Sequence, residues 1–183
     1  MKSVMKPAAS GAASAAASGA AGNSGCARAA GLTLDALLVC TGGGGLVGGC
    51  ALAVEGASPG TRVYAVEPEG WDDTARSPTI GTRQENARGG SLLCDSLLSQ
   101  MPGEMTFAVN QPRLAGGLVV SDAEVMAAIN FAFSYLKLVV EPGGAVALAA
   151  LLAGRFDARG KVVGVVISGG NVDPAVFGRA LAA

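Results

Sequence analysis

The apolar residues of this chain form short blocks in which strand-like runs alternate with helix-like segments. Residues 36–40, 62–66 and 161–167 are apolar runs short enough for buried β-strands. Residues 46–56 and 145–153 are longer segments rich in small apolar residues, and their length favours helices. Strands that alternate with helices are typical of a parallel sheet covered on both faces, so the pattern predicts an α/β fold.

Weaker patterns predict four further features. We expect a short helix within residues 91–100 and a short extended piece at residues 105–109. Ser121 and Glu124 have the spacing of a capping box, which predicts the start of another helix. Asp173, followed by a proline, predicts the cap and first position of a last helix.

The beginning of the chain has a different composition from the rest. Ala, Ser or Gly occupies 21 of the first 30 positions. Such a segment buries too little apolar surface to offset the entropy lost on ordering. We therefore expect a disordered tail over residues 1–33 and one folded region over residues 34–183.

Composition and charge exclude several classes of function. The net charge is −1 and the basic residues are scattered, which argues against a nucleic-acid or membrane surface. No apolar run is long enough to span a membrane. The chain has no histidine, which removes serine–histidine and cysteine–histidine catalysis and the usual zinc sites. The cysteines have no C-x-x-C spacing and are expected to be reduced and mostly buried in a cytoplasmic protein; they are Cys26, Cys40, Cys50 and Cys94.

Four consecutive glycines, residues 42–45, stand between the first predicted strand and the helix that begins near Leu46. Without side chains, their backbone N–H groups can converge on one anion. The unpaired N–H groups at the start of the helix add a partial positive charge. This glycine loop therefore predicts a site for a phosphorylated small molecule.

Two other interpretations of the glycine loop remain open at this point. Gly43, Gly45 and Gly48 match G-x-G-x-x-G, and Glu67 follows at the end of the next strand, where it could accept a hydrogen bond from a ribose hydroxyl. That arrangement predicts a dinucleotide-binding unit. The loop could also be only a turn that lets the helix and strand pack closely.

A resemblance to a known family favours the phosphate interpretation. Four ordered motifs carry it, at residues 39–46, 63–68, 136–145 and 167–173, with shorter matches at 91–97, 102–107 and 116–122. Together they resemble the C-terminal half of the threonine/serine dehydratases and serine racemases, which use pyridoxal phosphate. The resemblance implies a partial doubly wound parallel sheet of the tryptophan-synthase-β-like fold (fold type II), with the N-terminal half absent. It also implies an ammonia-lyase that converts threonine or serine into a 2-oxo acid and ammonia.

The same resemblance assigns roles to individual residues. The glycine loop and the residue after it hold the cofactor phosphate, and the serine after the last strand faces the pyridine nitrogen. The implied cofactor-binding residues are Gly42, Gly43, Gly44, Gly45, Leu46, Ser168 and Gly169. A serine is a weaker partner for that nitrogen than an aspartate, which suits elimination.

Two of the motif residues keep alternative interpretations. Ser168 could be a hydroxyl at a strand end that satisfies a nearby backbone group. Glu141 lies in a motif near the cofactor pocket, and it has either a role there or only hydrogen bonds to backbone N–H groups.

The resemblance also implies a divalent cation site. Glu67, Trp71 and Asp73 match positions that supply two carboxylates and one backbone carbonyl in racemase-like members. Oxygen ligands of this kind suit Mg²⁺ or Ca²⁺. The alternative is that Asp72 and Asp73 cap the helix that starts there.

One family feature is missing from this chain. The lysine that carries the cofactor in the family stands in a Ser-x-Lys-x-Arg-type motif, followed by a Ser-x-Gly-Asn loop in the same N-terminal half, and neither motif occurs upstream of the glycine loop here. None of the lysines, which are Lys2, Lys6, Lys137 and Lys161, has a fitting context. The sequence therefore predicts a truncated or rearranged protein, or half of a split one, that is inactive alone. We expect it to form homo-oligomers or to associate with a complementary half. A non-catalytic phosphate-binding fragment is the alternative.

Overall fold

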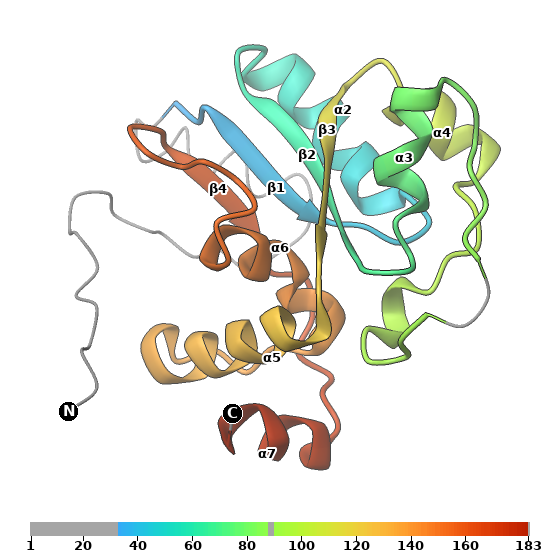
Figure 1. The fold of residues 1–183 in the computed structure, drawn as a ribbon. Coiled ribbons are helices and arrows are strands. Elements are labelled where there is room, and N and C mark those ends of the chain that lie inside the picture. The colour runs from blue at the N-terminus through green and yellow to red at the C-terminus, as the bar shows by residue number, and fades with distance from the viewer. Residues whose placement is uncertain (1–32, 88–89, 183) are drawn as a thin grey trace.

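The structure is a computed structural model that describes residues 33–87 and 90–182. Four strands form one sheet in the order β3-β2-β1-β4, and every pair of neighbours is parallel (Figure 1). The strands are β1 (Ala36–Cys40), β2 (Arg62–Pro68), β3 (Leu114–Val120) and β4 (Val163–Val166). The predicted α/β fold with a parallel sheet is confirmed.

Helices cover both faces of this sheet (Figure 1). One layer contains α2 (Gly45–Ala57), α3 (Asp73–Ile80) and α4 (Glu104–Asn110). The other layer contains α6 (Pro142–Leu152), α5 (Asp122–Phe131) and α7 (Pro174–Ala182). Helix α5 packs on α6, and α7 packs on α5. A π-helical turn, η2 (Ala132–Leu136), extends α5, and a 3₁₀ turn, η1 (Asp95–Leu97), lies near α6. Within the described ranges, no helix has both the length and the apolar character needed to cross a membrane.

The alternation of side chains along β1 divides the core into two parts. Leu37 and Val39 point toward α2, where they belong to a cluster with Val47. Leu38 and Cys40 point to the other face and join the cluster formed by α5 and α6. All five β1 residues are buried because helices cover both faces, which explains the continuous apolar run in the sequence.

Three segments between β2 and α5 differ from the sequence-based expectations. Residues 105–109 form most of a helix, α4, although their alternating apolar residues resemble a strand. Only the three residues of η1 are helical within 91–100. The sequence pattern did not predict the strand β3, because its adjacent glycines Gly116 and Gly117 interrupt the apolar run.

The cysteine prediction is confirmed for the described residues. Cys40, Cys50 and Cys94 are buried free thiols. Burial raises the pKa of Cys50 to about 11 and that of Cys94 to about 12, so both stay protonated at neutral pH. Cys26 lies outside the described residues.

We predict that Gly117→Ala destabilises the protein much more than Gly116→Ala. A Cβ on Gly117 would overlap the Cα and Cβ of Ala75 in α3, whereas one on Gly116 would lie 3.5 Å from the Tyr64 ring. Overpacking of this kind should lower the free energy of unfolding by about 1–3 kcal/mol. Urea unfolding followed by circular dichroism measures the difference. Equal effects of the two substitutions would show that β3 and α3 are not in close contact.

Candidate functional site

The glycine loop and Ser168 meet at the carboxyl edge of the sheet. The loop follows β1, Ser168 follows β4, and these two parallel strands are neighbours, with Val39 paired to Val166. The chain leaves β1 toward β2 on one side, while β4 lies on the other side. The loop therefore lies where the strand order reverses, which is the usual place for ligands in open α/β sheets.

The loop has the geometry of an anion cradle. Gly44 is the N-cap of α2 and has φ +85°, a conformation that favours glycine. Gly43 and Gly45 are exposed. No acceptor for the backbone N–H groups of residues 42–46 is found among the described residues. These groups and the positive end of α2 can together bind a phosphate.

Ser168 is connected to the strand that carries the loop. The thiol of Cys40, the last residue of β1, donates a hydrogen bond to Ser168 Oγ over 3.0 Å. Burial raises the pKa of this thiol, which keeps it protonated as a donor. Ser168 itself is exposed, so its own hydroxyl proton is available to a ligand. Among the described residues its hydroxyl bonds to no backbone group, which does not support the strand-end alternative.

Glu141 and Gly169 form a compact support for the turn that follows Ser168. The Glu141 carboxylate accepts a hydrogen bond from the N–H of Asn171 at 3.0 Å, and the Glu141 N–H donates to the Gly169 carbonyl. A Cβ on Gly169 would lie 2.5 Å from Glu141 Oε1. A larger residue at position 169 would displace this carboxylate, and the structure places Glu141 in its backbone-bonding role.

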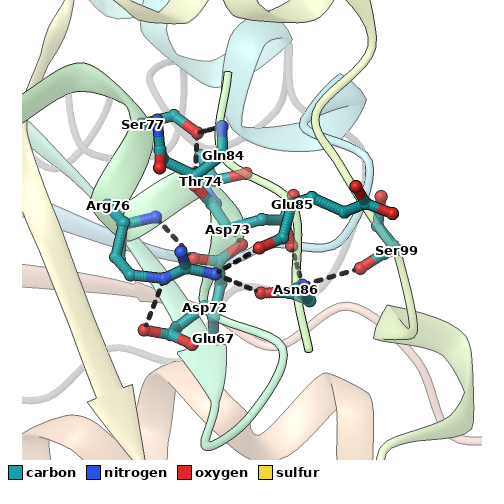
Figure 2. A network of polar contacts seen from close by, with 11 residues as sticks. Glu67, Asp72, Asp73, Thr74, Arg76, Ser77, Gln84, Glu85, Asn86 and Ser99 are labelled. Atoms are coloured by element: carbon teal, nitrogen blue, oxygen red, sulfur yellow. Dashed lines mark hydrogen bonds and ion pairs between the residues drawn. The ribbon is translucent and has the colours of Figure 1, made fainter. Parts of the chain in front are cut away.

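Glu67 lies on the other side of the sheet edge, where Figure 2 shows it among polar residues of α3 and the following loop. Its carboxylate is 0% exposed and accepts hydrogen bonds from the N–H groups of Thr74 (3.1 Å) and Ala75 (2.6 Å). Glu67 therefore caps α3. Asp72 is the N-cap residue of α3 and Asp73 lies in its first turn, as the alternative expected, but the Asp72 side chain makes no cap hydrogen bond and pairs with Arg76 instead.

Asp73 is the second buried carboxylate of this region. Burial and the charge of Asp73 raise the pKa of Glu67 well above its usual value, and burial raises that of Asp73 to about 6. Asp73 Oδ1 accepts a hydrogen bond from Asn86 Nδ2 at 2.6 Å, whereas Oδ2 is buried and has no partner among the residues that the structure describes. The Trp71 carbonyl also accepts no hydrogen bond from any described residue. These unpaired oxygens fit a cation, although the described ranges contain no cluster of three His, Cys, Asp or Glu side chains.

The position of Glu67 also decides against the dinucleotide interpretation. A ribose hydroxyl needs an exposed carboxylate at the end of the second strand. Glu67 is fully buried and has both oxygens bonded to α3. It cannot receive a ribose in this structure.

Comparison with known proteins identifies the family. The sequence model of the pyridoxal-phosphate dependent enzymes matches residues 4–169. This chain belongs to that family. Serine racemase from Schizosaccharomyces pombe and L-threo-3-hydroxyaspartate ammonia-lyase from Saccharomyces cerevisiae are each 38% identical to it over 148 residues, which are 76% of this chain and 43% of each relative. The crystal structure of a threonine deaminase from T.th. is 37% identical, with a TM-score of 0.74, and the match covers 80% of this chain and 52% of that one.

These matches establish the fold as that of the fold type II pyridoxal-phosphate enzymes, within the serine/threonine ammonia-lyase and racemase group. The chain spans less than half the length of the curated relatives it matches. The match of the family model begins at residue 4, inside the segment of simple composition whose structure is not described.

Sequence reasoning missed two residues that organise these regions. Cys40 was recognised only as a buried thiol, although it bonds to Ser168 across two strands. Asn86 lies in an irregular segment without any pattern, yet it bonds to Asp73, Arg76 and Ser99 (Figure 2). No local signal marks such residues, because their partners come from other parts of the chain.

We predict that Asn86→Asp destabilises the protein by about 2–4 kcal/mol, because it replaces a buried donor to Asp73 with a third buried carboxylate. Gln84→Glu adds the same charge two residues away, where the side chain bonds only within its own loop, and should change stability by no more than about 0.5 kcal/mol. Chemical unfolding of both variants at pH 7 gives the comparison. Similar losses for the two would mean that added charge, not the lost hydrogen bond, is responsible.

Proposed function

We propose that this chain provides the cofactor-phosphate and pyridine-nitrogen side of a pyridoxal-phosphate ammonia-lyase that converts threonine or serine into a 2-oxo acid and ammonia. The main observation in support is the meeting of the glycine loop and Ser168 at the carboxyl edge between β1 and β4. The substrates follow from the similarity to threonine deaminase, hydroxyaspartate ammonia-lyase and serine racemase.

The residues present fit the cofactor. The unpaired N–H groups of the glycine loop and Leu46 would hold its phosphate, with Ser168 and Gly169 beside the ring nitrogen. The cofactor, when bound, supplies the electron withdrawal that labilises bonds at the substrate Cα. A neutral hydroxyl stabilises a protonated ring nitrogen less than a carboxylate would, and this weaker electron withdrawal is compatible with β-elimination.

Of the two lysines within the described ranges, Lys161 lies away from this site, and the Nζ groups of both donate to carbonyls of their own segments. Lys161 precedes β4 and so lies at the amino edge of the sheet, opposite to Ser168. Its Nζ donates to the Asp157 carbonyl, and that of Lys137 donates to the Ser134 carbonyl. Lys2 and Lys6 lie outside the described residues. We therefore propose that the 183-residue chain alone does not catalyse turnover.

A partner would supply what this chain lacks. The edge strand β4 has a single neighbour, β1, in the described sheet. Several large apolar side chains are exposed around η2, including Tyr135 at 74% and Val139 at 54%. Unpaired edges and exposed apolar groups support association with a second copy or with a complementary half. The buried thiols are consistent with a cytoplasmic location.

The second candidate is a non-catalytic subunit that binds the cofactor or another phosphate ligand. The placement of Lys161 at the opposite edge favours it, because binding of phosphate needs only the glycine loop. Trapping of the cofactor distinguishes this candidate from a catalytic chain.

We predict that borohydride treatment of the chain with pyridoxal phosphate leaves no stoichiometric adduct on one lysine, and that threonine yields no 2-oxobutanoate above the rate with free cofactor. Peptide mass spectrometry locates the adducts, and Lys137→Arg and Lys161→Arg serve as matched controls that should behave like the wild type. A single adduct on Lys137 or Lys161, lost in the corresponding variant together with activity, would contradict the proposal.

We also propose that Glu67, the Trp71 carbonyl and Asp73 bind Mg²⁺ or Ca²⁺. Asp73 Oδ2 has no hydrogen-bond partner within residues 33–87 and 90–182, and the two neighbouring carboxylates offer the oxygen ligands that these ions prefer.

Millimolar Ca²⁺ or Mg²⁺ should raise the Tm of the protein by about 5 °C, since an ion bound only by the folded state stabilises it. Asp73→Asn removes a charged ligand and should abolish this shift, whereas Asp72→Asn should retain it because Asp72 bonds to Arg76 instead. Thermal unfolding with and without a chelator measures both. A shift that persists in Asp73→Asn would place the ion elsewhere.

A further inference from the structure

The glycine loop is held from one side by two side chains of α4. Thr106 Oγ1 lies 2.8 Å from the Gly43 carbonyl, to which it can donate, and 3.1 Å from the carbonyl of Gly103 in its own turn. Asn110 Nδ2 donates to the Gly44 carbonyl at 3.0 Å. Because the two residues are four positions apart, they lie on the same face of α4. Both therefore face the loop.

The packing around these contacts is close. Gly44 is buried, and a Cβ on it would lie 2.8 Å from Asn110 Nδ2 and 3.2 Å from Thr106 Cβ. Asn110 is only 2% exposed, and a Cβ on Gly48 in α2 would lie 2.9 Å from its Oδ1. Glycines at positions 44 and 48 thus allow α4 to approach the start of α2.

The geometry of the peptide bond gives these contacts a consequence for the open side of the loop. In a planar trans peptide the C=O and the following N–H point in opposite directions. Holding the carbonyls of Gly43 and Gly44 against α4 therefore directs the N–H groups of Gly44 and Gly45 away from it. Four consecutive glycines would otherwise sample many backbone conformations.

We propose that Thr106 and Asn110 are positioning residues for a phosphate ester: by fixing two carbonyls of the glycine loop, they orient its N–H groups toward the ligand. This inference rests on the proposed function, because it assumes that the loop binds a phosphate. The two residues do not touch the ligand themselves.

A purely structural role would be to attach α4 to α2. Other contacts serve that purpose. Arg113, just after α4, forms an ion pair with Glu55 of α2 at 2.9 Å, and Val109 packs near Gly48. Arg83 also bonds to Glu104 and to the Pro102 carbonyl at the other end of α4. The helix therefore has attachments that do not depend on Thr106 or Asn110.

The test compares two ligands that differ only in the phosphate. Pyridoxine 5′-phosphate and pyridoxine both lack the aldehyde, so neither can react with lysines, and calorimetric titration gives the Kd of each. Thr106→Val removes the hydroxyl but keeps the shape, and Thr106→Ser restores it. Asn110→Leu removes the amide donor, and Met105→Ala alters an exposed position of the same helix as a matched control.

We expect Thr106→Val to weaken binding of the phosphate ester about three- to tenfold, as for the loss of one hydrogen bond, and to leave pyridoxine binding unchanged. Thr106→Ser and Met105→Ala should bind the ester within about twofold of the wild type, and Asn110→Leu should lose at least as much as Thr106→Val. If Asn110→Leu does not fold, the threonine pair still decides the question.

The possible results distinguish failure of the positioning role from failure of the proposed function. Equal loss for both ligands, or no loss for the ester in Thr106→Val, would overturn the positioning role while leaving the phosphate site in place. A wild-type chain that binds the ester no better than pyridoxine would instead overturn the proposed function, and the inference with it.

Discussion

The candidate site depends on one constraint, which is a set of backbone N–H groups without acceptors in the described part of the chain. Such groups are costly when buried, so they persist only where a ligand or water can reach them. Here they lie in the glycine loop at the end of β1. The parallel sheet places the loop beside Ser168, and the Cys40 thiol joins the two strand ends. Main-chain groups therefore form the phosphate side of the proposed site.

Glycines also allow neighbouring elements of the structure to approach one another closely. Gly44 and Gly48 leave room for side chains of α4, and Gly117 leaves room for α3. Gly169 leaves room for the carboxylate of Glu141. Each of these positions places backbone next to backbone or next to a polar side chain. A substitution at Gly117 would push α3 away from β3, and one at Gly44, Gly48 or Gly169 would displace the Asn110 amide or the Glu141 carboxylate. The many glycines of this chain are therefore part of its packing.

The buried acids Glu67 and Asp73 hold α3 and the loop after it in place. Glu67 caps α3 with both carboxylate oxygens, and Asp73 receives the amide of Asn86 (Figure 2). Their pKa values are raised by burial and, for Glu67, by the adjacent Asp73. Two neighbouring carboxylates of this kind form a costly arrangement that a bound cation would relieve.

The sequence by itself determined the parallel α/β fold, the glycine loop between β1 and α2, the capping box at Ser121 and the family. These features depend on local patterns: apolar runs, consecutive glycines and cap residues are set by neighbours along the chain. Only the tertiary structure decided that residues 104–110 are helical, because Met105, Phe107 and Val109 alternate as in a strand while packing on α2 overrides that pattern. It also decided the roles of Cys40, Asn86, Thr106 and Asn110. Apart from the Gly103 carbonyl near Thr106, their partners lie between 10 and 128 positions away, and no local periodicity records contacts over such separations.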